Sequence, residues 1–386
     1  MLGHNFDSLQ ECYDLFMCAA TARRLDEAQK EALESEHEVS IDFGPETFQV
    51  WQGGATGGVK WVLKNDDLQF FFCTPVTSSG QIRRWAVQVR YLSAGLWEYG
   101  IDFLRQRAIA CLTQAGFTWV DEAGEVVEGS MLQEFAPSWQ RINRVDYAFD
   151  FESPNFTNEM RNKRLGERLV LPSGVKYGDV GTSTTLQTIT IGMNRANVQI
   201  QVYDKGAEIT EASGKVWMYK VWEKNGFKPP EEGKPANIWR MEIRFGKDFL
   251  KDRGVRTFDE FKEKMQEFFC EAIFKRRLSN PQNKMKREEW PLHPLFAECY
   301  RATEQAGKYA PIGRQMTLRH EELKTMLDKQ TQGLARSRSV LDYGDYKDAE
   351  TQQNLMHIGE EIKNAPGHTE KIEKAKERYK HVRDAR

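Results

Sequence analysis

Residues 144–151 read Arg-Val-Asp-Tyr-Ala-Phe-Asp-Phe. Because side chains alternate across a β-strand, this stretch predicts a strand with one fully apolar face. Its other face carries Asp146 and Asp150 beside an arginine. Residues 198–205 and 238–245 show the same alternation of apolar and polar side chains. The three stretches therefore predict strands of an antiparallel sheet that has one apolar and one polar face.

The segments around these strands predict an α+β protein. Alternating apolar residues predict further strands between residues 39 and 91 and at Leu186–Ile191. Apolar residues at helical spacing predict helices at residues 8–36, 100–115 and 258–273. Residues 315–386 are polar and charged, and we expect them to be helical as well. We therefore expect a mainly antiparallel sheet with helices on its apolar face, followed by a helical C-terminal extension.

The acidic residues of the polar face predict a metal site. For a single strand, such alternation is usually no more than a half-solvated sheet. That explanation is weakened here because aspartate is depleted in strands, and two aspartates on one face repel each other unless a cation lies between them. Asp146, Asp150 and Glu242 together predict an oxygen-ligand site suited to Mg²⁺ or Mn²⁺.

A tyrosine, Tyr203, lies on the polar side of residues 198–205. The ordinary explanation of a lone strand tyrosine is amphipathic surface packing. A phenol with a pKa of about 10 attacks poorly at neutral pH unless a metal, base or cation is near. Lys205, Arg240 and Arg244 are cations on the same predicted face, and arginine can bind a phosphate with two parallel hydrogen bonds. This neighbourhood favours a nucleophile.

Four short motifs occur in a fixed order along the centre of the chain. They are the stretch at residues 144–151, Thr-Ile-Gly at residues 190–192, Gln-Val-Tyr-Asp-Lys-Gly-Ala-Glu at residues 201–208 and Trp-Arg-Met-Glu-Ile-Arg at residues 239–244. In this order, they resemble the replication initiation factor family. That family includes rolling-circle initiators of Gram-positive plasmids, filamentous-phage replication proteins and related conjugative nicking enzymes. The resemblance extends over residues 59–273, and Tyr-Asp-Lys is its most specific part.

The resemblance implies a metal-dependent transesterification by a tyrosine. The phenolic oxygen attacks a phosphodiester of an exposed single strand and leaves a 5′-phosphotyrosine and a free 3′-hydroxyl. Position by position, the nucleophile falls on Tyr203, the basic support on Lys205 and Arg240, and the metal ligands on Asp146, Asp150 and Glu242. The implied partners are origin DNA with an exposed single strand, a host helicase and a second copy of the chain.

Two other functions remain open beside a rolling-circle replication initiator. A relaxase of a mobile or conjugative element would use the same chemistry, but no segment marks a contact to a coupling protein. A DNA-binding regulator on the same scaffold would have lost catalysis, which the retained tyrosine and carboxylates argue against. The common two-histidine nicking enzymes are disfavoured because no His-hydrophobic-His pair occurs on a predicted strand.

A basic run without any acidic residue lies at residues 272–287. Its cations are Lys275, Arg276, Arg277, Lys284, Lys286 and Arg287. The ordinary explanation is a solvated helix end. If the chain nicks DNA, we expect this run to bind the backbone of the duplex, and Arg244 on the polar face to contact the strand as well.

Three parts follow from these segments. We expect an N-terminal helical segment at residues 1–38 and a catalytic nicking domain at residues 39–275. A helical region at residues 276–386 would then serve DNA binding or oligomerisation. The long stretch between residues 213 and 236 and the C-terminal region match no motif of the family, so they leave origin recognition unassigned.

The composition predicts a soluble cytoplasmic protein, and the family resemblance implies a bacterial one. The formal net charge of −2 gives no overall basicity, and hydrophobic residues make up 40% of the chain. Its six cysteines form no close pairs at metal-ligand spacing, as expected in a reducing compartment. We find no signal peptide and no apolar stretch of about 18 residues, so no membrane partner is expected.

Overall fold

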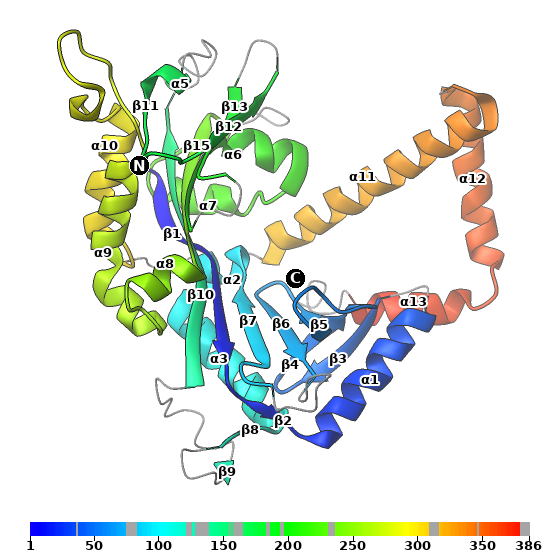
Figure 1. Cartoon of the computed structure of the whole chain (residues 1–386). Coiled ribbons are helices and arrows are strands. Elements are labelled where there is room, and N and C mark those ends of the chain that lie inside the picture. Colours follow the sequence, from blue (N-terminus) through cyan, green and yellow to red (C-terminus); the bar gives the residue numbers. More distant parts are fainter. Residues whose placement is uncertain are drawn as a thin grey trace. The chain divides into compact units, whose positions relative to one another are not determined.

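The computed structural model describes residues 1–35, 38–74, 83–120, 126–127, 139–153, 156, 165–182, 186–193, 197–230, 236–308, 316–345 and 347–378. Its largest element is an eleven-stranded sheet in which all neighbouring strands are antiparallel (Figure 1). With helices packed on this sheet, the chain has the predicted α+β fold.

The strands that carry the predicted site lie side by side in the middle of the sheet. In spatial order the strands are β12 (Tyr177–Gly181), β13 (Leu186–Ile191), β14 (Val198–Asp204), β15 (Ile238–Gly246), β10 (Gln140–Glu152), β1 (Gly3–Tyr13), β7 (Val87–Tyr91), β6 (Leu68–Cys73), β5 (Val59–Lys64), β4 (Glu46–Val50) and β3 (Val39–Phe43). The order confirms that the three stretches first singled out, β10, β14 and β15, are neighbours.

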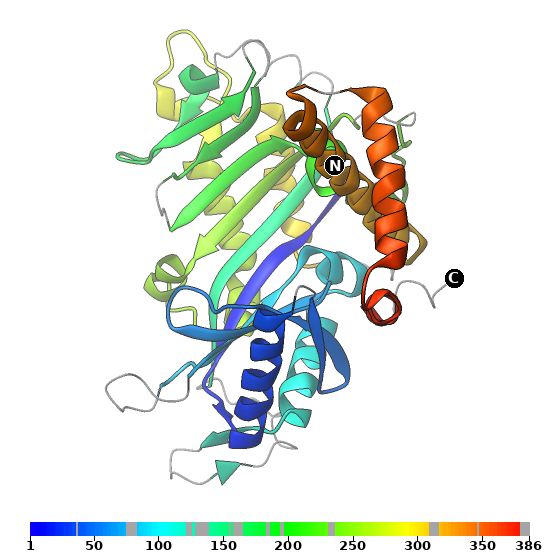
Figure 2. The ribbon, with the colours of Figure 1, turned by 90° about the vertical axis from the view of Figure 1, so that its right-hand side faces the viewer.

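The apolar face of β10, β14 and β15 is covered by helix α9 (Phe258–Lys275), which lies behind these strands in Figure 2. Phe269 of α9 packs on Tyr147 of β10 with ring centroids 4.8 Å apart and on Phe245 of β15 at 5.5 Å. The helix begins with a capping box, in which the Thr257 side chain accepts from the Glu260 backbone N–H and the Glu260 side chain accepts from the Thr257 N–H.

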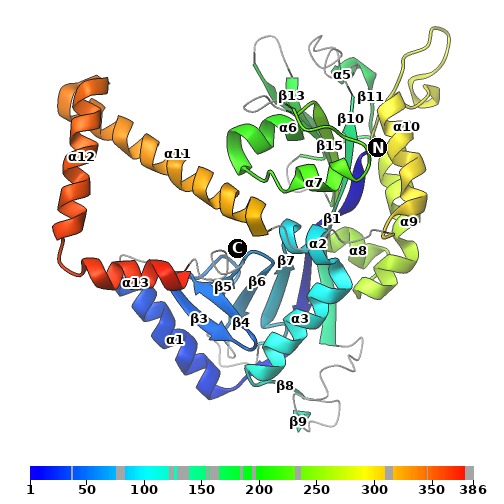
Figure 3. The ribbon, with the colours of Figure 1, turned by 180° about the vertical axis from the view of Figure 1, so that it is seen from behind.

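The same face of β3–β7 is covered by α1 (Ala19–Glu34) and α3 (Ile101–Gln114), as Figure 3 shows from behind. Leu25 of α1, Leu104 of α3 and Phe70 of β6 belong to one continuous hydrophobic core. Because all the large helices of this part lie on one face, the opposite face is left for polar side chains.

The helix predicted at residues 8–36 is wrong in its first part, because Gly3–Tyr13 is a strand and the helix spans only Ala19–Glu34. A β-bulge at Asp7 interrupts the alternation of β1, and Glu11 occupies a core-facing position. The apolar residues Phe6, Leu9 and Tyr13 are therefore three and four positions apart. This spacing is that of a helix, although the residues lie on one face of a bulged strand.

The remaining elements are short or belong to the C-terminal region. They are β2 (Phe16–Met17), β8 (Phe117–Val120), β9 (Val126–Val127), β11 (Leu169–Val170), β16 (Arg277–Leu278), α2 (Ser93–Tyr99), α5 (Leu165–Arg168), α6 (Lys205–Glu208), α7 (Met218–Glu223), α8 (Lys247–Asp252), α10 (Pro294–Ala302), α11 (Met316–Tyr343), α12 (Asp348–Asn364) and α13 (His368–Arg378). The last three confirm the predicted helical C-terminal region, of which residues 379–386 lie outside the described residues.

The chain divides into two compact units. The first contains Met1–Gly206, Val221–Pro230 and Ala236–Gly313, and it includes the whole sheet. The second contains Ala207–Lys220, Glu231–Pro235 and Arg314–Arg386. None of the helices in the described part of the chain is long and apolar enough to cross a membrane.

Candidate functional site

Three rows of side chains cross β14, β15 and β10 on the polar face of the sheet. The pairing of the strands sets each row, because directly opposed residues lie on the same face. The rows are Tyr203–Arg240–Asp150, Gln201–Glu242–Ala148 and Gln199–Arg244–Asp146. The structure therefore brings together on one face the predicted nucleophile, the three predicted metal ligands and both strand arginines.

Arg240 is fully buried and held by two carboxylates. Its Nε and one terminal nitrogen donate to the two oxygens of Asp150 at 2.6 and 2.8 Å, and its other terminal nitrogen donates to Asp7 Oδ1 at 2.7 Å. Trp222 Nε1 donates a further hydrogen bond to Asp150 at 2.9 Å. Burial alone would lower the pKa of Arg240, but Asp150 and Asp7 raise it well above its ordinary value. The guanidinium is thus a fixed charge under the site.

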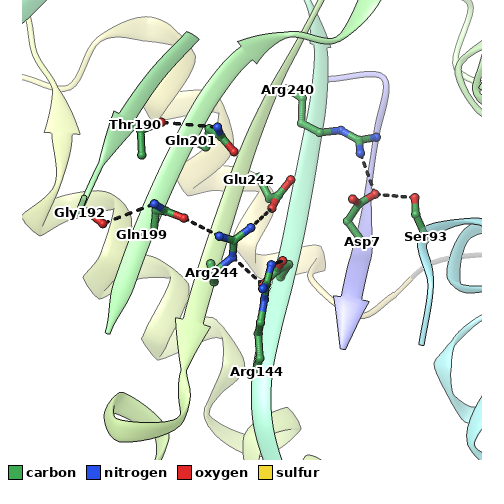
Figure 4. Close-up of polar contacts among 11 residues, drawn as sticks. Asp7, Ser93, Arg144, Thr190, Gly192, Gln199, Gln201, Arg240, Glu242 and Arg244 are labelled. Atoms are coloured by element: carbon green, nitrogen blue, oxygen red, sulfur yellow. Dashed lines mark hydrogen bonds and ion pairs between the residues drawn. The ribbon is translucent and has the colours of Figure 1, made fainter. Parts of the chain in front are cut away.

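Asp7 is a residue of the site that the sequence did not predict (Figure 4). The β-bulge of β1 places it on the polar face, where its Oδ1 also accepts hydrogen bonds from Ser93 Oγ at 2.8 Å and Trp97 Nε1 at 3.2 Å. Because residues 1–38 were expected to be a helical segment, the place of Asp7 on the sheet was not predicted. The detectable signal was the charged residue between Phe6 and Ser8, at the point where the alternation fails.

Tyr203 is half-buried, at the end of β14 where helix α6 begins. Arg240 lies directly opposite on β15, and the two side chains interact electrostatically. The ammonium of Lys205, which is buried, is 5.8 Å from the centre of the Tyr203 ring. The predicted nucleophile therefore lies beside a buried ammonium and a guanidinium that is paired with Asp150 and Asp7.

Arg244 connects the other two carboxylates (Figure 4). Its Nε donates to Asp146 Oδ1 at 3.1 Å, and a terminal nitrogen donates to Glu242 Oε1 at 3.1 Å. Arg144 holds Asp146 from the same strand by a bidentate ion pair. The side chains of Arg144 and Arg244 are 31% and 32% exposed, so these arginines can be reached from solvent, unlike Arg240.

Glu242 has an unusual charge environment. Burial, followed by the nearby charges of Asp7 and Asp146, raises the pKa of Glu242 to about 7, although Arg244 and Arg240 oppose the shift. Three carboxylates therefore influence one another at this point of the polar face. A carboxyl that titrates near neutrality in such a cluster is a common feature of functional sites.

The predicted metal ligands do not form a common metal site in this arrangement. Both oxygens of Asp150 accept hydrogen bonds from Arg240, and both oxygens of Asp146 accept from Arg144. Within the described ranges, no group of three or more His, Cys, Asp or Glu side chains is placed to hold a metal ion. A requirement for Mg²⁺ or Mn²⁺ stays a prediction.

The basic run at residues 272–287 contains two kinds of residue. Arg277 is buried and donates to the carbonyls of Phe274 and Glu288, both at 2.5 Å, and Arg287 donates to the carbonyl of Leu169 at 2.5 and 3.0 Å. These two arginines therefore stabilise the fold by hydrogen bonds to backbone carbonyls. Burial also lowers the pKa of Arg276, and Lys275 pairs with Glu271 at 2.8 Å. Lys284 and Lys286 are exposed and remain the best-placed cations of the run for duplex DNA.

Comparison with solved structures gives distant likenesses. The chain is similar to a solved structure described as the rolling circle replication initiator protein from Geobacillus stearothermophilus, with 12% identity and a TM-score of 0.40. The match covers 79% of this chain and 98% of that chain. No protein-family model and no curated protein matches the sequence. At this identity and TM-score the likeness assigns no function, and the proposal below depends on the residues of the site.

Proposed function

We propose that the chain is a rolling-circle replication initiator that nicks one DNA strand with Tyr203. The observation that carries the proposal is the row Tyr203–Arg240–Asp150. It places a half-buried tyrosine on the polar face, directly beside a guanidinium that two carboxylates hold. The family resemblance of the motifs supports the same tyrosine. An ordinary surface tyrosine needs no buried arginine paired with two carboxylates next to it.

The proposed step is a transesterification at phosphorus. The Tyr203 oxygen attacks the scissile phosphate, the new O–P bond forms and the P–O3′ bond breaks. The phenol loses its proton, the departing 3′-oxygen gains one, and the products are a 5′-phosphotyrosine and a free 3′-hydroxyl. Rolling-circle replication then extends the free 3′-hydroxyl as a primer.

The basic residues of the polar face have different roles in the proposed reaction. Arg240 is fully buried, so we assign it a positioning role: it fixes the charge and the strand geometry beside Tyr203. Lys205, over the tyrosine ring, adds positive charge where the attacked phosphate becomes more negative in the transition state. Arg144 and Arg244, each about one-third exposed, would contact neighbouring phosphates of the strand.

The test is nicking of a supercoiled plasmid that carries the DNA flanking the gene, with Mg²⁺ or Mn²⁺ added. We expect Tyr203→Phe to lower the nicking rate by at least about 100-fold, because the phenylalanine has no oxygen to form the covalent intermediate. The matched control is Tyr177→Phe, which changes an exposed tyrosine on the other face of the same sheet.

Covalent protein–DNA adduct, separated by denaturing electrophoresis, gives an independent readout. Wild type and Tyr177→Phe should form the adduct, and Tyr203→Phe should not. If Tyr203→Phe nicks as fast as wild type, Tyr203 is not the nucleophile. If wild type binds the DNA but forms neither nick nor adduct, the chain is a DNA-binding regulator instead.

A further inference from the structure

A second feature lies on the polar face of the same sheet, mainly over β5–β7 and the residues 51–56 that follow β4. It is an open groove of about 560 Å³. Polar side chains form much of its lining, and the groove also contains the ring of Phe71. Neither the family motifs nor the nicking chemistry uses these strands, so the groove needs an explanation of its own.

Strand pairing connects the groove to the nicking site. Gln10 of β1 lies opposite Arg144 of β10 on one side and opposite Arg90 of β7 on the other. The row continues to Gln69 of β6, Lys64 of β5 and Gln49 of β4. A row of polar side chains therefore extends from Arg144 through the groove.

The groove carries positive charge that nearby acids do not neutralise. Arg90 is half-buried and stacks over the Phe71 ring at 5.5 Å, but it pairs with no carboxylate among the described residues. Burial lowers the pKa of Arg90, and Arg144 and Arg244 lower it further against the opposing effect of Asp146. Lys64, in the same row, likewise has no acidic partner in the described part of the chain. Such a site favours an anionic ligand.

The groove also carries groups that recognise bases. Gln69 is only 4% exposed and lines the groove, yet none of the described residues hydrogen-bonds to its amide. The amide is not fully enclosed, so it can exchange hydrogen bonds with water for hydrogen bonds with a ligand in the groove. Trp51, at the border of the groove, exposes 43% of its surface, and a flat exposed indole is a stacking platform for an unpaired base.

We infer that this groove binds unpaired nucleotides of the DNA strand next to the scissile phosphate. Arg90 and Lys64 bind phosphates, Trp51 stacks on a base, and Gln69 hydrogen-bonds to a base edge. The inference rests on the proposed nicking function, because the row through Gln10 reaches Arg144 on the same polar face of the sheet that carries Tyr203. The groove would add to the nicking site a surface that binds the strand and recognises its bases.

The experiment measures binding of the full-length chain to fluorescein-labelled oligo-dT and oligo-dA of about 20 nucleotides by fluorescence anisotropy, without added metal. Trp51→Ala should weaken oligo-dT binding about tenfold, as loss of one stacked base predicts. Arg90→Gln should weaken it about fivefold, as loss of one phosphate contact predicts. The control Arg301→Gln removes an exposed arginine of α10 and should leave the affinity unchanged.

Gln69→Met separates recognition from a merely structural role. It keeps the side-chain length and removes the amide, so it should change the ratio of oligo-dA to oligo-dT affinity about fivefold. A fold defect would weaken both oligonucleotides equally and would lower the melting temperature. If all three groove variants bind both oligonucleotides as wild type does, the groove does not bind the strand. The same conclusion follows if the variants weaken binding of both oligonucleotides equally and also lower the melting temperature.

The result remains distinct from that of the nicking test. Nicking by wild type with unchanged binding by the groove variants overturns the groove and leaves Tyr203 in place. Weakened binding by the groove variants, in a chain that forms no tyrosine adduct, supports the groove and overturns the nicking chemistry.

Discussion

The charge of Glu242 is the residue-scale feature with the clearest consequence for stability. Its pKa rises from 4.5 to about 7 in the folded chain, so the folded state holds a proton over a range of pH in which the unfolded state has lost it. Stability therefore falls as the pH rises through this range, and the full cost is present above about pH 7.

We predict that Glu242→Gln raises the free energy of unfolding by about 2–3 kcal/mol at pH 8, because the amide removes the buried negative charge. The gain should decrease toward zero as the pH approaches 4.5, where the wild-type carboxyl is protonated in both states. Urea unfolding at several pH values measures it. Glu263→Gln, at an exposed position of α9, is the control and should be neutral at every pH. A gain that does not depend on pH would contradict the charge explanation.

The buried pair of Arg240 and Asp150 leads to a second prediction. Arg240→Met leaves Asp150 buried without its bidentate partner, and we expect a loss of about 3–5 kcal/mol in the free energy of unfolding. Adding Asp150→Leu to this variant should recover a large part of the loss, since it removes the unpaired charge. Urea unfolding of the two single variants and the double variant measures the coupling. If the losses in free energy of unfolding of the two single variants add up in the double variant, Arg240 and Asp150 do not stabilise each other.

At the scale of elements, a strand could be predicted from the sequence where its apolar residues alternate regularly with polar ones. The strands β10, β14 and β15 were correctly predicted because apolar residues alternate without interruption over residues 145–151, 198–202 and 239–245. β1 was missed because a bulge and a buried glutamate gave its core residues helical spacing. Its site residue Asp7 was missed for the same reason.

The side-chain interactions between elements could not be predicted from the sequence. Alternation placed Arg240 and Asp150 on the polar face, but it could not show that one binds the other under the cover of Trp222. Exposure depends on what lies above a face, and residues distant in sequence form that cover. The sequence therefore predicted a catalytic contact for Arg240, whereas its burial favours a positioning role.

Helix α9 gives an element-scale prediction that is independent of the nicking site. Thr257→Ala removes the side-chain oxygen that accepts from the Glu260 N–H, and we expect a loss of about 1 kcal/mol in the free energy of unfolding. Thr257→Ser keeps that oxygen and is the matched control. Thermal unfolding should rank wild type and Thr257→Ser above Thr257→Ala. An equal loss in both variants would indicate that packing of the threonine methyl group, and not the capping box, stabilises this end.

At the scale of the whole molecule, the proposed DNA binding must be local, because the chain has a formal net charge of −2. Such a molecule has no overall attraction for a polyanion. The cations available on the polar face are few: Arg90 and Lys64, which have no acidic partner among the described residues, and the partly exposed Arg144 and Arg244. A strand held by these residues releases few counterions, whereas a large basic surface would release many.

We therefore predict a shallow salt dependence for single-stranded DNA. With four phosphate contacts, the logarithm of the association constant should fall against the logarithm of salt concentration with a slope of about −3. Arg90→Gln should make that slope less steep by about 0.7, while Lys284→Ala should not change it. Anisotropy titrations of oligo-dT at several salt concentrations measure the slopes. A slope steeper than about −6 would mean that residues outside the polar face, such as the exposed lysines near Lys284, bind most of the strand.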